Sequence, residues 1–326
     1  MKEALFYEKL NDNVVKCILC PHFCVLKSGD CGFCLNRKNI DGKLYSLNYG
    51  VVSSVNIDPI EKKPLYHFYP GSQIFSVGTF GCSLNCQFCQ NYTIARNKAS
   101  KEKYGEITPS KIIELAKTYS DMIAYTYNEP YIWYEFLIET VELARKESIK
   151  NVLVTNGYYN KEPWEKLSYY IDAMNIDLKG DSEFYKRLCS GDIDPVLQTI
   201  ESAFNKGIHV EVTYLVLTAE NEDPYIFSEI LKRVSVISRL IPFHISRYFP
   251  SYKFDAPPTN IKKMEEFYLI ASKEMEYVYL GNVLEHNNTV CPKCGKLLIE
   301  RRGYHVKIID NFKGRCSCGY KFYGMF

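Results

Sequence analysis

The sequence predicts an α/β fold around a parallel sheet, because short apolar runs alternate with longer amphipathic stretches between about residues 74 and 284. The apolar runs predict strands at 74–79, 122–127, 151–155, 173–178, 210–216, 242–246 and 277–280. The amphipathic stretches predict helices at 109–119, 131–146, 195–205, 225–238 and 261–274. Strands that alternate with helices pair in parallel through right-handed crossovers, so the sheet is either doubly wound or curled into a barrel.

Local signals support individual elements. Thr108 is the expected N-cap of the first predicted helix. Ahead of the alternating region, the turn dipeptide Asp41-Gly42 precedes residues 44–47. Together with residues 51–55, these predict a β-hairpin.

The composition is that of a chain with one sizeable core. It has 326 residues, of which 46% are apolar, and no run of about 18 apolar residues that could cross a membrane. The net charge of +2 gives no broad attraction to nucleic acid or anionic membranes. The first residues contain no apolar stretch typical of a signal peptide, so we expect a cytoplasmic protein. In a reducing compartment, the 13 cysteines favour metal sites over disulfides.

Three of these cysteines, Cys82, Cys86 and Cys89, occupy one loop, residues 81–91, directly after the first predicted strand. We call this segment the cluster loop. A cubane iron–sulfur cluster is held by four thiolates, so three on one loop would leave one iron free to bind a ligand. The alternatives are a zinc loop or a ferredoxin-like electron carrier, but zinc sites pair two C-x2-C units and the next cysteine is Cys189. Cys189 itself is expected to be a small buried hydrophobe.

Polar residues stand at the ends of the later predicted strands. In both kinds of parallel sheet, active-site residues lie at the carboxyl ends of the strands, and the cluster loop lies at the same rim. The residues added there are Asn128, Glu129, Asn156, Asp177, Lys179 and His244. Taken singly, Glu129 could stabilise the N-terminus of a helix, and Asp177 and Lys179 could form a plain ion pair. His244 could be an ordinary core histidine.

The C-x3-C-x2-C spacing of Cys82, Cys86 and Cys89, with Phe88 before the last cysteine, resembles the signature of the radical S-adenosylmethionine superfamily. The resemblance implies a [4Fe-4S] cluster whose open iron binds S-adenosylmethionine. It also implies that an electron from the cluster cleaves the sulfonium, and that the 5′-deoxyadenosyl radical then takes a hydrogen atom from a substrate. The protein would position the cofactor and exclude competing reactions.

Other residues resemble activating enzymes of the pyruvate formate-lyase type. The cofactor-binding residues that we predict are Phe88, Asn128, Glu129, Asn156, Asp177, Lys179 and His244. The resemblance implies that Glu129 binds the cofactor's amino group, that Asp177 and Lys179 contact its ribose and carboxylate, and that Phe88 lies against its adenine. Glu129 stands in Tyr-Asn-Glu-Pro where those enzymes have Gly-Gly-Glu-Pro, and an Asn backbone approaches a ligand less closely than a Gly backbone does.

A narrower resemblance, to the AmmeMemoRadiSam system radical SAM enzymes, covers nearly the whole chain. Besides the cluster loop it includes residues 17–24, 32–34, 41–45, 58–68 and 281–283. The resemblance implies a partial TIM-type (β/α)6 barrel at residues 71–285. A Cys-rich metal-binding region with the β-hairpin would precede it at 1–70, and a zinc-ribbon-like module would follow at 286–326.

The remaining cysteines form two sets. In the N-terminal set, Cys17, Cys20, Cys24 and Cys34 match the cysteines of that narrower group, whereas Cys31 does not. Four thiolates suit a closed zinc site, which the C-x2-C pair favours, or a second iron–sulfur cluster.

The C-terminal set, Cys291, Cys294, Cys316 and Cys318, resembles a zinc ribbon with two knuckles about 20 residues apart. The second knuckle is C-x-C rather than C-x2-C. Basic residues around it form a modest positive surface, which could bind nucleic acid but is more typical of a solvated face. We therefore expect a structural role for this module.

The resemblance implies an oxygen-sensitive iron–sulfur enzyme that takes electrons from a donor such as ferredoxin or flavodoxin. Its substrate is a protein or a small molecule that the sequence does not identify. The alternative is a binding or scaffold protein that engages RNA or protein through its zinc modules without turnover. Family resemblance alone does not establish a substrate.

Overall fold

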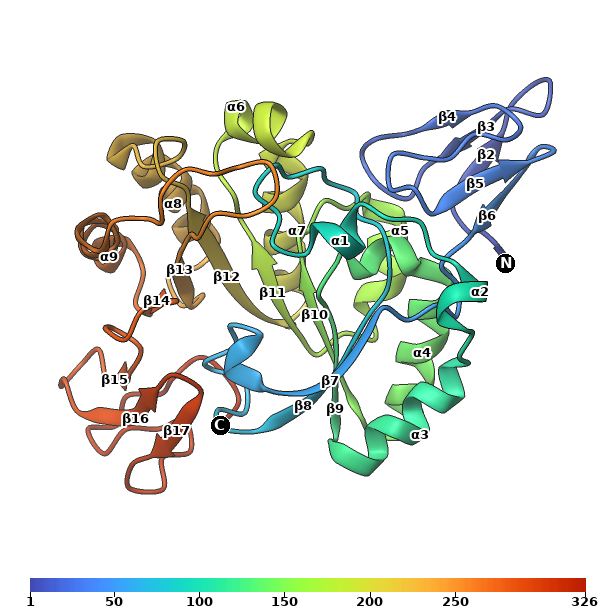
Figure 1. Cartoon of the computed structure of the whole chain (residues 1–326). Helices are drawn as coiled ribbons and strands as arrows, with labels where there is room; N and C mark the ends of the chain where they lie inside the picture. Colours follow the sequence, from blue (N-terminus) through green and yellow to red (C-terminus); the bar gives the residue numbers. More distant parts are fainter.

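The computed structural model describes residues 1–326, and its centre is an eight-stranded sheet (Figure 1). The strand order is β14-β13-β12-β11-β10-β9-β8-β7. The strands are β7 (Ser54–Pro59), β8 (Gln73–Gly78), β9 (Met122–Tyr125), β10 (Lys150–Thr155), β11 (Ala173–Asp177), β12 (His209–Val216), β13 (Phe243–Arg247) and β14 (Val278–Gly281). Neighbours from β8 to β14 pair in parallel, and β7 pairs antiparallel with β8. The edge strands do not pair with each other, so the sheet is an open, partial barrel.

The predicted strands are all present. The parallel part has one strand more than a (β/α)6 pattern, because β14 follows the last long helix and pairs with β13. Long helices cover one face of the sheet (Figure 1). They are α3 (Pro109–Tyr119), α4 (Tyr134–Lys146), α5 (Lys161–Ser168), α7 (Ile193–Asn205), α8 (Pro224–Ile237) and α9 (Ile261–Glu274). None of the helices combines the length and the apolar character that a bilayer span requires.

Shorter turns connect these elements. They are α1 (Tyr92–Ala95), α2 (Lys101–Tyr104), α6 (Ser182–Phe184), the 3-10 turns η1 (Ile60–Lys62) and η2 (Pro130–Trp133), and the π-helical turn η3 (Tyr185–Cys189). Because η2 occupies the expected first turn of α4, that helix begins at Tyr134 rather than at residue 131. α5 was not predicted; it has eight residues, and Pro163 lies within it. Such a short segment carries too little apolar periodicity to be recognised.

The hairpin prediction was wrong about its partner strand. β6 (Lys43–Ser46) pairs antiparallel with β5 (Arg37–Ile40), which precedes the turn. Asp41 and Gly42 between them have φ of 49° and 81°, as a tight two-residue turn requires. Residues 51–55 lead instead into β7, at the edge of the main sheet. The partner was missed because β5 is largely polar and lacks an apolar strand pattern.

Small sheets flank the main sheet on two sides (Figure 1). The N-terminal region forms β1-β6-β5 and β2-β3-β4, and the C-terminal region forms β15-β16-β17. Their further strands are β1 (Lys2–Glu3), β2 (Tyr7–Lys9), β3 (Val15–Cys17), β4 (Val25–Leu26), β15 (Thr289–Val290), β16 (Leu297–Arg302) and β17 (His305–Ile308). A buried ion pair of Arg37 with Glu135, 2.7 Å long, joins the N-terminal region to α4. Arg301 of β16 donates to the Tyr66 carbonyl at 2.8 Å and joins the C-terminal region to the barrel.

Residues 60–68 fill part of the sheet's inner face, opposite the helices. Ile60, Leu65 and Phe68 form a small core with apolar side chains of β8 to β11. The Asn175 side chain of β11 donates to the Pro64 carbonyl at 2.8 Å. This segment blocks one end of the inner face and leaves the carboxyl ends of the strands open.

Candidate active site

A cavity of about 570 Å³ lies at the carboxyl ends of the parallel strands. Its volume is in the range of small-molecule sites. The cluster loop and the ends of β9 to β11 together supply Cys82, Cys86, Phe88, Cys89, Asn128, Glu129, Asn156, Asp177 and Lys179. The structure therefore brings together every residue that the sequence predicts for this site except His244.

The start of the cluster loop depends on a glycine. Gly81 has φ of 92°, in the left-handed region that favours glycine. A Cβ at this position would clash with the Asn36 side chain and with the Cys34 carbonyl, so only a glycine lets the N-terminal region pack this closely against the loop. On its other side, the loop is held by the Asn85 N–H, which donates to the Cys189 carbonyl at 2.8 Å.

The three thiols of the cluster loop are free and only partly exposed. Burial raises the pKa of Cys89 to about 11. The pKa of Cys86 is raised well above its usual value by contact with the Cys189 thiol and by burial. Buried thiols with raised pKa values act as ligands only when a bound metal stabilises the thiolate. Their three sulfur atoms do not all lie within 4.8 Å of one another, unlike those of a compact tetrahedral zinc site.

Glu129, at the end of β9, is the most perturbed acid of the cavity. It is 1% exposed and accepts hydrogen bonds from the backbone N–H of Tyr131 at 3.0 Å and of Asn156 at 2.8 Å. The Thr155 hydroxyl donates to it at 2.8 Å. Burial raises the pKa of Glu129 to about 7, although these hydrogen bonds act in the opposite direction. A cavity carboxyl that titrates near neutrality is typical of a functional site.

Two asparagines join the strand ends to the cluster loop. The Asn128 side chain donates to the Gly81 carbonyl at 2.8 Å. The Asn156 side chain donates to the Ser83 hydroxyl at 3.0 Å and lies 3.5 Å from the Cys82 sulfur. Both residues therefore hold the loop in place as well as lining the cavity.

Asp177 and Lys179 form the ion pair that the sequence allowed, with 2.9 Å between Lys179 Nζ and Asp177 Oδ2. The pair lines the cavity rather than lying in the core. Lys179 is nearly buried, whereas the Asp177 side chain is 42% exposed. One carboxylate oxygen thus remains open to a ligand. Phe88 is buried beside Phe184, with 5.8 Å between the ring centroids.

His244 does not line the cavity. It lies deeper on the inner face of the sheet, with Nε2 2.6 Å from Glu211 Oε2. Glu211 also interacts with His209 Nε2 at 2.9 Å and accepts from the backbone N–H of Tyr66 and His67. This arrangement matches the ordinary core role that the sequence left open for His244.

Known proteins are similar to this chain in sequence and in fold. A protein of Methanocaldococcus jannaschii described as uncharacterized is 47% identical over 98% of this chain and 98% of its own length. The family described as the Radical SAM superfamily matches residues 76–227, which include the cluster loop, Glu129 and Asp177. The chain belongs to the radical SAM superfamily.

Two further proteins are more distantly similar to this chain. A second protein of Methanocaldococcus jannaschii, provisionally named a glycyl-radical enzyme activating enzyme, is 29% identical over 63% of this chain and 77% of its own length. The structure of Streptococcus suis SuiB bound to S-adenosylmethionine has a TM-score of 0.51 at 14% identity, over 68% of this chain and 53% of that chain, and is similar in fold. Membership implies an enzyme with a [4Fe-4S] cluster and S-adenosylmethionine.

The C-terminal cysteines of this radical SAM protein fit a zinc ion. All four sulfur atoms lie within 4.8 Å of one another. The Cys291 and Cys318 sulfurs are 3.6 Å apart, and those of Cys294 and Cys316 are 3.7 Å apart. Two ligands on a tetrahedral zinc with bonds of about 2.3 Å lie about 3.8 Å apart. The C-x-C knuckle therefore still permits a tetrahedral site.

The N-terminal cysteines are less compact. The pKa of Cys20 is raised by burial and by the nearby thiols of Cys17, Cys34 and Cys24, but Cys31 takes no part. The four sulfurs of this set do not all lie within 4.8 Å of one another. This set borders the cluster loop. His22, which lies between Cys20 and Cys24, has its Nε2 atom 2.6 Å from the Ser83 carbonyl oxygen.

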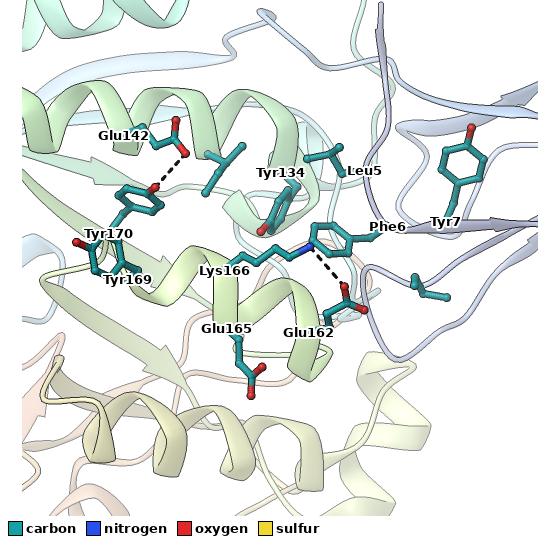
Figure 2. A pocket seen from close by; sticks show the side chains of 12 residues that line it. Leu5, Phe6, Tyr7, Tyr134, Glu142, Glu162, Glu165, Lys166, Tyr169 and Tyr170 are labelled. Atoms are coloured by element: carbon teal, nitrogen blue, oxygen red, sulfur yellow. Dashed lines mark hydrogen bonds and ion pairs between the residues drawn. The ribbon is translucent and has the colours of Figure 1, made fainter.

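A second hollow, of about 650 Å³, lies between the N-terminal strands and helices α4 and α5 (Figure 2). Phe6, Tyr134 and Tyr169 supply much of its apolar lining. The Tyr170 hydroxyl donates to Glu142 at 3.1 Å across one end of it. It contains no cysteine and shares no residue with the cavity at the strand ends.

Sequence reasoning missed part of the strand-end cavity. Its further lining includes Lys62, Lys63, Asn282 and Tyr304. Lys62 and Lys63 stand in the string 58–68, which the narrower family resemblance singled out without a role. Tyr304 comes from the hairpin between β16 and β17, and nothing in its sequence points to the barrel.

Proposed function

We propose that this enzyme reductively cleaves S-adenosylmethionine at a [4Fe-4S] cluster held by Cys82, Cys86 and Cys89. The observation that carries the proposal is that these thiols and the buried Glu129 carboxylate line one cavity. When bound, the cluster and S-adenosylmethionine together supply a 5′-deoxyadenosyl radical that removes a hydrogen atom from the substrate.

The chain's own residues bind and orient the cofactor. Glu129 accepts the cofactor's amino group, because it is the buried acid nearest the cluster loop. The open carboxylate oxygen of Asp177 accepts from a ribose hydroxyl, and Lys179 holds Asp177 in place and faces the cofactor's carboxylate. Phe88 packs beside the adenine. His244 has no contact with the cofactor in this proposal.

Cleavage consumes one electron, for which we propose reduced ferredoxin or flavodoxin as the donor. The relative named as a glycyl-radical enzyme activating enzyme supports a protein substrate. The cavity volume of about 570 Å³ is also in the range of small-molecule sites.

We also propose zinc at the C-terminal set, which its sulfur spacing supports. At the N-terminal set the wider spacing favours a second iron–sulfur cluster over zinc. Metal analysis of anaerobically purified protein tests both proposals. Zinc together with iron beyond the needs of one cluster supports them, whereas two zinc ions per chain with iron for one cluster contradict the second cluster.

The enzyme proposal is tested on anaerobically reconstituted, chemically reduced protein by measuring 5′-deoxyadenosine. Wild type and Cys31→Ala should form it from S-adenosylmethionine, because Cys31 lies outside each cysteine set. Cys86→Ala should lose the product together with the part of the visible absorbance that comes from the cluster at Cys82, Cys86 and Cys89. Wild-type protein that carries its cluster and forms no 5′-deoxyadenosine would contradict the proposal.

A further inference from the structure

One wall of the strand-end cavity has no part in binding the cluster or the cofactor. Lys62 and Lys63 lie on it, at the end of η1, together with Tyr127 after β9 and Tyr304 from the C-terminal hairpin. These residues come from three separate parts of the chain. The proposed binding of the cluster and the cofactor gives these residues no role.

Both lysines interact with a single carboxylate. Lys62 Nζ lies 2.8 Å from Asp58 Oδ1, and Lys63 Nζ lies 2.7 Å from Asp58 Oδ2. The Lys63 side chain is 2% exposed, and that of Lys62 is 45% exposed. Two ammonium groups facing one carboxylate leave one positive charge in excess. Lys63 is the buried partner of Asp58, so the excess charge lies on Lys62, which lines the cavity and is open to a ligand.

The neighbouring acids do not neutralise this excess charge. Glu61 is adjacent in sequence, but it faces Arg301, with 3.7 Å between Arg301 Nε and Glu61 Oε1, and accepts from the Gly71 N–H. Asp177 is already paired with Lys179. The remaining acid of the cavity is Glu129, which the proposed function assigns to the cofactor's amino group.

Tyr127 is held against this wall in a strained conformation. Its φ of 73° is uncommon for an aromatic residue and costs free energy. Its hydroxyl donates to Asp58 at 2.5 Å and accepts from the Asn56 side chain at 3.1 Å. Lys63 Nζ lies 4.6 Å from the centre of its ring. Strain of this kind is retained where the surrounding structure needs the side chain in one position.

Tyr304 brings the C-terminal module to the same wall. The pKa of Lys62 is raised mainly by its hydrogen bond with Asp58 and also by the nearby Tyr304. The hairpin that carries Tyr304 is positioned by Arg301, which is buried and donates to the Tyr66 carbonyl. The module thus contributes a hydroxyl group to the cavity.

We propose that Lys62 and Tyr304 bind an anionic group, a carboxylate or a phosphate, of a small-molecule substrate, while Lys63 holds Asp58 in place beside Lys62. This inference rests on the proposed function, in which the cofactor occupies the opposite side of the same cavity. A small molecule is favoured because the cavity, of about 570 Å³, has the volume of small-molecule sites.

Calorimetric titration of the reconstituted protein with inorganic phosphate and, separately, with acetate tests this proposal. Wild type should bind at least one of the two anions. The anion that binds more tightly shows whether the substrate group is a phosphate or a carboxylate. Lys62→Gln should bind it roughly tenfold more weakly, because a charged hydrogen bond is lost. Tyr304→Phe should weaken anion binding by a smaller factor than Lys62→Gln does. Lys232→Gln is the matched control, since Lys232 is an exposed lysine paired with Glu229 on α8.

Two results would overturn the proposal: no binding of either anion by wild type, or equal weakening by Lys62→Gln and Lys232→Gln. Thermal unfolding of each variant establishes that it is folded. The 5′-deoxyadenosine assay separates the two proposals. An enzyme that cleaves S-adenosylmethionine and binds no anion here contradicts only the substrate inference, whereas a protein that binds the anion without cleavage contradicts only the proposed function.

Discussion

The Glu129 carboxylate accepts a hydrogen bond from the Asn156 N–H, at 2.8 Å, across the ends of β9 and β10. The side chain of the same asparagine lies 3.5 Å from the Cys82 sulfur. One residue therefore connects the acid assigned to the cofactor with a cysteine assigned to the cluster. The two halves of the proposed site share a rigid support, so their relative position is set by the sheet.

The affinity for S-adenosylmethionine should fall as the pH drops below about 7. The pKa of Glu129 is raised to about 7 by burial, and only the carboxylate attracts a cationic amino group. Protonation therefore competes with binding, by up to about tenfold per pH unit on the acidic side, and affinity levels off on the alkaline side. Equilibrium dialysis across this range measures the effect. Glu129→Gln should bind weakly with little pH dependence; the same pH dependence in wild type and variant would contradict the assignment.

Cys189→Ala should lower the reduction potential of the cluster. The Cys189 thiol contacts Cys86, and hydrogen bonds to cluster sulfurs are among the factors that set the potential. When Cys86 is a thiolate bound to the cluster, the Cys189 thiol is the only proton donor of the pair, so its removal leaves more negative charge on the Cys86 sulfur. A redox titration followed by electron paramagnetic resonance measures the change, with Cys31→Ala as control. An unchanged potential would show that the contact is purely a packing contact.

Glu211→Ala should destabilise the fold by about 3–5 kcal/mol, because removing one partner leaves buried polar groups uncompensated. Glu211 interacts with His209 and His244 and accepts two backbone N–H groups. Urea unfolding measures the loss. Glu229→Ala, at an exposed ion pair on α8, should change the stability by less than about 0.5 kcal/mol. Similar losses in the two variants would argue against a structural role for the Glu211 cluster.

Removal of zinc from the C-terminal set should lower the thermal unfolding midpoint. A structural zinc contributes directly to folding free energy. The effect should extend beyond the module, since buried Arg301 bonds to the Tyr66 carbonyl and Tyr323 accepts from the Val210 N–H at 2.9 Å. Chelation followed by circular dichroism, with zinc release measured in parallel, tests this. A full release of zinc with an unchanged midpoint would contradict a structural role.

Local sequence patterns predicted secondary structure correctly where burial of apolar residues dominated. The strands from β8 to β14 are apolar runs, and their parallel pairing follows from alternation with helices. The prediction failed where local and tertiary preferences differed. The polar strand β5 is recognisable only through its pairing with β6, and α5 only through the burial of Trp164 and Leu167 in the main core.

The sequence by itself determined the cluster loop, its place after a strand, and the strand-end residues Asn128, Glu129, Asn156, Asp177 and Lys179. Spacing and strand direction suffice there, since all parallel strands end at the same rim. Only the tertiary structure decided whether His244 and Lys62 line the cavity. His244 lies below the cavity because Glu211 binds it, whereas Lys62 reaches the cavity because residues 60–68 cross the inner face. Contacts between distant segments leave no local pattern, so they become visible only once the chain is folded.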